Sequence, residues 1–192
     1  MKFCSIILLW IMLLTQGFSY EKSGFKIYGD VMLILPFAMM AYSYSIDDIQ
    51  GVKQQAIGAG ATLIGTHLIK QGFVIASRSN EANARISQRP NNGSFDGFPS
   101  GHTSFVFSSV GFAQKRYGWK WGLPLAAVAT SVGISRIYAE RHTTAQVISG
   151  AIFGFGTSYL LASKYQPKHL SLSLHTAIDG TPSYHLHYKK AF

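Results

Sequence analysis

Histidines and arginines gather in one part of the sequence, at positions that look like loops between apolar segments. His102 ends the run Pro99-Ser100-Gly101-His102, and His142 follows Arg136 by six residues. A histidine nitrogen can attack phosphorus to give a covalent intermediate, and a second histidine can protonate the leaving oxygen. The pattern therefore predicts phosphoryl transfer, with these two histidines as the reacting groups.

Groups suited to binding phosphate accompany both histidines. Arg89 and Arg136 can each form paired hydrogen bonds with non-bridging phosphate oxygens. Residues 99–102 precede an apolar segment, so free N–H groups at a helix start would point at the anion. Gly101 lets the backbone approach closely, and Ser100 adds a hydroxyl donor. The sequence contains no cluster of metal ligands, so we expect neither a metal nor another cofactor.

The elements that must position these groups are apolar segments. Hydrophobic residues make up 47% of the 192 residues and charged residues 13%, about half the usual share of roughly 25%. We expect an all-α membrane bundle of about five to six helices, although several segments fall short of the about 20 residues that span a bilayer, which leaves a soluble helical bundle as the alternative. The expected segments cover residues 27–46, 52–76, 103–114, 119–134 and 144–162.

The two ends of the chain differ from this middle. Residues 1–19 resemble a secretory signal, with Lys2 before an apolar core; an uncleaved anchor helix is the alternative. The helical domain is expected over 20–168. In the tail, 169–192, apolar and polar residues alternate on both sides of a turn signal, which predicts a short β-hairpin.

Charge predicts how the bundle is oriented. Lys115, Lys120 and Lys164 lie on one side if the chain leaves the signal outside, and basic loops favour the inner face of a membrane. The histidine-bearing loops then face outward. In a bacterial inner membrane this places the site in the periplasm.

Three motifs together resemble the signature of the type 2 phosphatidic acid phosphatase superfamily. They are Arg89-Pro90, then Pro99-Ser100-Gly101-His102, then Ser135-Arg136 with His142. The resemblance implies a phosphohistidine mechanism with His142 as the nucleophile and His102 as the general acid. It implies that the phosphate cradle comprises Arg89, Arg136, Ser100 and Gly101.

The chain departs from the family pattern in two places. Ala82 stands where the family usually has a lysine, and either Lys70 or Arg85 could supply that charge. A lysine within a membrane helix is costly and usually functional, which favours Lys70. Gln146 replaces an aspartate four residues after His142; its amide oxygen can still accept the imidazole N–H. Asp30 is the best-placed acid that could compensate for the missing charge.

The apolar segments favour a phosphorylated lipid in the membrane as the partner of this site. The net charge of +9 also fits nucleic acid, but the basic residues lie between apolar segments rather than on a polar face, so no nucleic acid is expected. The resemblance is nearest to bacterial lipid A phosphatases. The alternatives are an undecaprenyl pyrophosphate or phosphatidylglycerophosphate phosphatase, or a catalytically impaired phosphate-binding membrane protein.

Overall fold

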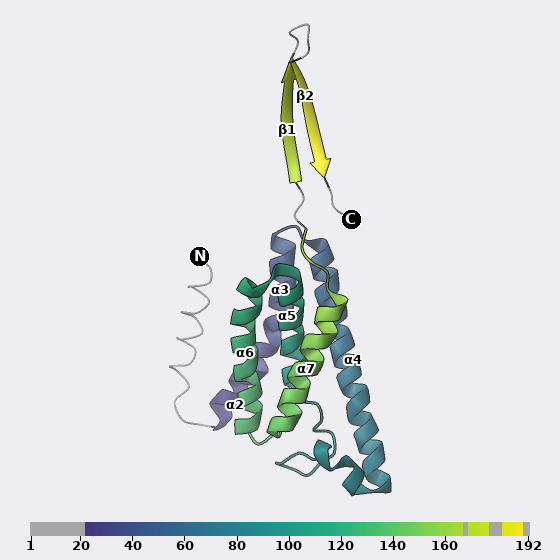
Figure 1. Cartoon of the computed structure of the whole chain (residues 1–192). Coiled ribbons are helices and arrows are strands. Elements are labelled where there is room, and N and C mark those ends of the chain that lie inside the picture. Colours follow the sequence, from purple (N-terminus) through teal and green to yellow (C-terminus); the bar gives the residue numbers. More distant parts are fainter. Residues whose placement is uncertain (1–21, 167–168, 177–181, 190–192) are drawn as a thin grey trace.

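The computed structural model describes residues 22–166, 169–176 and 182–189 (Figure 1). The expected signal segment, 1–19, lies outside these residues, as does the turn of the expected hairpin. The described elements are α2 (Lys22–Val31), η1 (Met32–Ile34), α3 (Leu35–Ser45), α4 (Ile49–Ser79), η2 (Glu81–Ser87), α5 (Gly101–Tyr117), α6 (Trp119–Tyr138), α7 (Thr144–Leu161), β1 (His169–Thr176) and β2 (Pro182–Lys189).

All five apolar segments expected from the sequence form helices, so the all-helical bundle is confirmed. The first segment comprises α2, η1 and α3 in continuous succession. Local signals set the boundaries of the others. Asp48 caps α4 by accepting a hydrogen bond from Gly51 N at 2.9 Å, and Gly118, with φ of 84°, allows the turn between α5 and α6.

Helix α5 is the centre of the bundle and packs against α3, α4, α6 and α7. It lies so close to α7 that glycine is required at the contact. A Cβ at Gly154 would collide with the backbone of Ser104, and one at Gly111 with the backbone of Phe155. At these two glycines the backbones of α5 and α7 are therefore in direct contact, with no side chain between them.

The interior of the bundle is unusually rich in small and polar side chains. Fully buried residues include Ser104, Ser108 and Ser109 of α5, beside the larger Val106 and Phe112. Many large apolar side chains point outward instead. Those on α4, α6 and α7 include Ile57, Leu63, Ile64, Leu68, Leu123, Ile134, Ile148, Ile152 and Leu160.

Among the residues that the structure describes, one helical stretch, Gly24–Ser45, is long and apolar enough to cross a membrane on length and composition alone. The remaining expected segments form helices that do not meet this criterion. Helix α5, at 17 residues, is too short for this criterion, and its buried serines lower its hydropathy as well.

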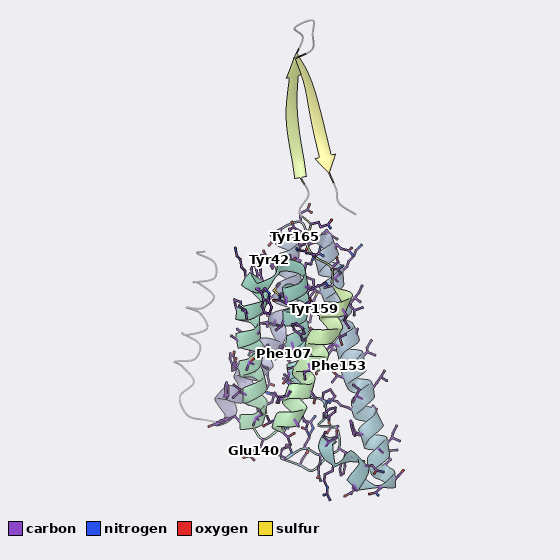
Figure 2. All side chains as sticks on the ribbon, viewed as in Figure 1. Tyr42, Phe107, Glu140, Phe153, Tyr159 and Tyr165 are labelled. Atoms are coloured by element: carbon purple, nitrogen blue, oxygen red, sulfur yellow. The ribbon has the colours of Figure 1, made fainter. Side chains whose placement is uncertain are left out.

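The segment 80–100 and the α6–α7 turn lie at one end of the bundle, and strands β1 and β2 lie beyond the other (Figure 1). The two strands pair antiparallel, with Leu172 opposite Leu186. They are the two segments in which apolar and polar residues alternate. Tyr42 and Tyr165 mark the strand end of the bundle in Figure 2, and Glu140 marks the loop end.

A buried ion pair joins α4 and α5 at the strand end. Arg116 and Asp48 are 5% and 4% exposed, and Arg116 Nε donates to Asp48 Oδ2 at 2.5 Å. Tyr117 also donates to Asp48 Oδ2, at 2.7 Å, and Arg116 Nη1 donates to Gln54 and to the backbone of Ser163. The network closes the end of the bundle that lies away from the loops.

We expect Asp48→Asn to destabilise the protein by about 3–5 kcal/mol, because it leaves the buried Arg116 without a counter-charge. Thermal unfolding in detergent measures the loss. Glu81→Gln, at an exposed position of η2, is the matched acid-to-amide control. An equal effect of the two substitutions would contradict a structural role for the pair.

Candidate active site

His142 lies in the turn between α6 and α7 and is almost fully buried, with 4% of its surface exposed. Arg136 O accepts hydrogen bonds from Arg141 N and His142 N, which closes the end of α6. Thr143 then caps α7 by accepting a hydrogen bond from Gln146 N. The imidazole is therefore attached to a turn that is fixed at both ends.

Gln146 fixes the orientation of this imidazole. Its Nε2 donates to the backbone oxygens of Ile86 and Gln88, both at 3.0 Å. Because only the amide nitrogen can donate to two carbonyls, Oε1 must face His142, whose Nδ1 lies 3.0 Å away. Nδ1 therefore carries the hydrogen, and Nε2 keeps its lone pair for reaction.

His102 occupies the first turn of α5 and pairs with a carboxylate rather than an amide. Its Nε2 lies 2.8 Å from Asp30 Oδ1, and Arg136 Nη1 donates to the same oxygen at 2.7 Å. Arg136 is 2% exposed. The N–H groups of the first turn of α5 have no intrahelical partners, so they remain available for an anion beside Gly101.

Arg89 is held by Asp96 through two hydrogen bonds, Nε to Oδ1 at 2.7 Å and Nη2 to Oδ2 at 2.9 Å. Lys70 of α4 donates to the backbone oxygen of Asp96. Burial alone would raise the pKa of Asp96, but the hydrogen bonds from Arg89 and Ser94 and the neighbouring positive charges outweigh it and hold the pKa at about 2. Asp96 is therefore ionised at all ordinary pH values. Its carboxylate orients Arg89, and its backbone oxygen binds Lys70.

These side chains line one pocket of about 270 Å³. Five of its nine lining residues are cationic and one is a carboxylate, which suits a small, multiply charged anion. The lining residues are Lys26, Asp30, Lys70, Arg89, Gly101, His102, Arg136, Arg141 and His142. The described residues contain no group of three or more His, Cys, Asp or Glu placed to hold a metal ion.

Most of the residues singled out in the sequence meet in this pocket, and three lie elsewhere. Arg85 is exposed on η2 and does not line it, so of the two alternative cations the fold brings Lys70 to the site. Ser100 is fully buried behind Gly101, where its hydroxyl accepts a hydrogen bond from Thr103 at 3.0 Å. Gln146 lies behind His142.

Sequence reasoning missed three charged residues near the pocket: Lys26, Asp96 and Arg141. Asp96 had a usable signal, since an acid in a Gly- and Asn-rich loop between two phosphate-binding motifs is placed to orient an arginine. Lys26 and Arg141 had none, because their positions depend on how α2 and the α6–α7 turn approach α5.

Chemically, the pocket combines a neutral imidazole with a free nitrogen, a second imidazole beside a carboxylate, and several cations. This is the equipment of phosphoryl transfer through histidine. A sequence model of the PAP2 superfamily matches residues 5–170. The chain therefore belongs to the PAP2 superfamily, and it is a phosphatase.

The chain is also similar to individual proteins of known name. The chain is 36% identical over 140 residues to a protein of Helicobacter pylori (strain J99) named lipid A 4'-phosphatase, a match that covers 73% of this chain and 70% of the relative. It is 32% identical over 123 residues to a lipid A 1-phosphatase of another Helicobacter pylori strain, covering 62% and 61%. A probable diacylglycerol pyrophosphate phosphatase of Schizosaccharomyces pombe is 34% identical over 87 residues, covering 38% and 31%. No solved structure matches the chain.

Two glycines near the pocket provide a matched pair of substitutions. A Cβ at Gly97 would lie 2.7 Å from both the nitrogen and the oxygen of the Gln146 amide and 2.6 Å from Ser87 O, so Gly97→Ala must displace the amide that orients His142. A Cβ at Gly101 would meet only Lys70 Cε, at 3.9 Å, and Thr66 Cγ2, at 4.0 Å.

We expect Gly97→Ala to lower kcat and the unfolding temperature. Gly101→Ala should leave the unfolding temperature unchanged and raise KM; the reverse ranking of unfolding temperatures would contradict this geometry.

The titration of His142 gives a second test. Burial lowers the pKa of His142 to about 4, and the charges of Arg89 and Lys70 act in the same direction, against the hydrogen bond from the ring to Gln146. The unfolded chain, with an imidazole pKa of about 6.5, binds more protons in this window, so the stability contribution of His142 rises with pH between about 4 and 6.5.

We expect the imidazole resonance that disappears in His142→Ala to titrate near pH 4 in an NMR experiment on histidine-labelled protein. A midpoint near 6.5 would mean that the ring is open to solvent and that the Gln146 contact does not form in solution.

Proposed function

We propose that the protein is a membrane lipid phosphatase that hydrolyses a phosphate ester through a phosphohistidine intermediate. The observation that carries the proposal is the meeting of His142, His102 and several cations in one anion-sized pocket. Membership of the PAP2 superfamily and the names of the lipid phosphatase relatives support it.

The mechanism begins with attack of His142 Nε2 on phosphorus. Gln146 keeps the hydrogen on Nδ1, so Nε2 presents its lone pair. Lys70, Arg89 and Arg136 neutralise the non-bridging oxygens, and the first turn of α5 at Gly101 adds backbone donors. Ser100 supports that turn from behind. His102 protonates the leaving oxygen and then accepts a proton from the water that hydrolyses the intermediate.

The surface of the bundle supports a membrane location. Large apolar side chains point outward while serines and glycines fill the helix contacts, which is the distribution expected in lipid, where close helix packing replaces a hydrophobic core. We place residues 20–168 in the inner membrane as the phosphatase domain, after a signal at 1–19 and before the tail at 169–192.

Charge supports a periplasmic site. Lys115, Lys120 and Lys164 lie at the strand end of the bundle and would face the cytoplasm. The arginines at the loop end do not contradict this orientation. Arg89 and Arg136 line the pocket and bind Asp96 and Asp30, so they serve the site rather than the orientation of the chain.

Lipid A is the substrate that we propose first. The two Helicobacter pylori relatives are lipid A phosphatases, one named for the 4' position and one for the 1 position. An undecaprenyl pyrophosphate or phosphatidylglycerophosphate phosphatase is the alternative. The relative named a probable diacylglycerol pyrophosphate phosphatase favours keeping diphosphates in the substrate panel.

We expect His142→Ala to abolish phosphate release, because the other imidazole that lines the pocket, His102, is paired with Asp30 and acts as the proton donor. Release is measured with purified protein in detergent against lipid A, undecaprenyl pyrophosphate, phosphatidylglycerophosphate and phosphatidic acid. His67→Ala is the matched control, since His67 is exposed on α4 and does not line the pocket. Undiminished release by His142→Ala would refute the nucleophile assignment. Release by neither protein, with retained vanadate binding, would favour the impaired phosphate-binding alternative.

A further inference from the structure

Asp30 is the one carboxylate among the described residues that line the pocket. It belongs to α2, whereas its two partners belong to other helices. Asp30 Oδ1 lies 2.8 Å from His102 Nε2 of α5 and accepts a hydrogen bond from Arg136 Nη1 of α6 at 2.7 Å. One oxygen thus connects the second histidine of the site to an arginine of the phosphate cradle.

The position of Asp30 is fixed by the fit of α2 against α6. Arg136 donates through Nη2 to Lys26 O and through Nε to its own neighbour Ser135 Oγ, the latter at 3.1 Å. Gly29, the residue before Asp30, allows α2 to approach α6 this closely, because a Cβ at that position would collide with Ser135 Oγ and the Arg136 guanidinium. The close packing of α2 against α6 therefore holds Asp30 in place.

We infer that Asp30 is the positioning residue for His102 in the proposed reaction, accepting the Nε2–H and leaving Nδ1 to exchange the proton with the leaving group. This inference rests on the proposed phosphatase function and adds to it a residue outside the three motifs. An ionised carboxylate can only accept, so the shared hydrogen lies on Nε2. The other ring nitrogen is then the proton donor.

The proton balance of the cycle follows from this assignment. His142 Nε2 forms a bond to phosphorus as the bond to the leaving oxygen breaks, and that oxygen takes its proton from His102 Nδ1. His102 becomes neutral and keeps Nε2–H on Asp30. Water then attacks phosphorus, gives a proton to His102 Nδ1, and the phosphorus–nitrogen bond breaks with its electron pair returning to His142. His102 ends as it began, an imidazolium paired with Asp30.

The surrounding charges explain why such a partner is needed. The other charged groups lining the pocket are cations from every element around His102: Lys26 of α2, Lys70 of α4, Arg89, Arg136 of α6, and Arg141. The remaining nearby carboxylate, Asp96, is bound by both Arg89 and Ser94. Without Asp30, an imidazolium at position 102 would face only positive charge before the substrate binds.

Asp30→Asn tests this inference through its dependence on the leaving group. p-Nitrophenolate leaves without protonation, whereas the alcohol of a lipid phosphate requires a general acid. We expect Asp30→Asn to lower kcat/KM for the lipid substrate about 10–100-fold, a part of the roughly 100–10,000-fold that general acid catalysis contributes. For p-nitrophenyl phosphate, the expected change is less than about threefold, since no acid is required. Because kcat/KM reports the steps up to loss of the leaving group, the comparison isolates that event.

The comparison of the two substrates distinguishes an effect of Asp30 on His102 from an effect on Arg136. Equal losses with both substrates would mean that Asp30 acts through Arg136 on the phosphate, and no loss with either would mean that it has no role; each result overturns the inference. Glu81→Gln, at an exposed position that does not line the pocket, should change neither value. With the lipid, the alkaline limb of the pH–rate profile should move to lower pH in Asp30→Asn, because loss of the anion makes the imidazolium easier to deprotonate.

The same experiment keeps the inference distinct from the proposed function. If the wild type releases no phosphate, or if His142→Ala is fully active, the phosphatase mechanism fails whatever Asp30 does. If the wild type is active, the selectivity of the Asp30→Asn defect decides the inference. Should Asp30→Asn not fold, Asp30→Glu keeps the charge but moves it, and the same selective loss, smaller in size, is expected; equal losses again overturn the inference.

Discussion

The side chain and backbone of Gln146 join the three segments on which the site depends. Its amide nitrogen binds Ile86 O and Gln88 O, next to Arg89. Its amide oxygen accepts a hydrogen bond from His142 Nδ1. Its backbone oxygen accepts one from Ser100 N at 2.9 Å, next to Gly101. A carboxylate at this position would oppose two carbonyl oxygens instead of binding them. The amide is therefore suited to its surroundings, although it brings no charge to the nucleophile.

The charges of the site are distributed accordingly. A neutral amide supports the histidine that must keep a lone pair, and a carboxylate supports the histidine that must carry a proton. The two imidazoles thereby have different partners, as is needed when one ring attacks and the other donates a proton. Burial and the cations of the pocket favour the neutral form of both rings, and Asp30 opposes them at His102.

Part of this arrangement could be predicted from the sequence. The helical segments followed from the length and apolar content of five stretches of the chain, and the three motifs were expected to meet because each lies at a helix end on one side of the bundle. The sequence favoured Lys70 over Arg85 because a lysine within a membrane helix is costly. The contact itself depends on how η2 folds back from the end of α4 and brings Arg89 beside Lys70. Asp30 could be named as the best-placed acid, but its partner depends on the α2–α6 contact, which no local pattern encodes.

The short apolar run at 103–114 illustrates a second limit. It belongs to a 17-residue helix whose serines and glycine face other helices, so its hydropathy understates its place at the centre of the bundle. Outward-facing leucines and isoleucines on the neighbouring helices carry the apolar signal instead. Average hydropathy cannot separate these two faces of a helix, whereas the packed structure does.

The glycine contacts between α5 and α7 have a mechanical consequence. His102 begins one of these helices and His142 directly precedes the cap of the other, and a Cβ at Gly150 would already press on Ser100 O at 2.7 Å. Backbones in direct contact leave no side chains that could yield by changing rotamer. The distance between the attacking nitrogen of His142 and the donating nitrogen of His102 is therefore fixed by rigid helix packing. A substrate must fit this distance, because the two helices cannot shift to accommodate it.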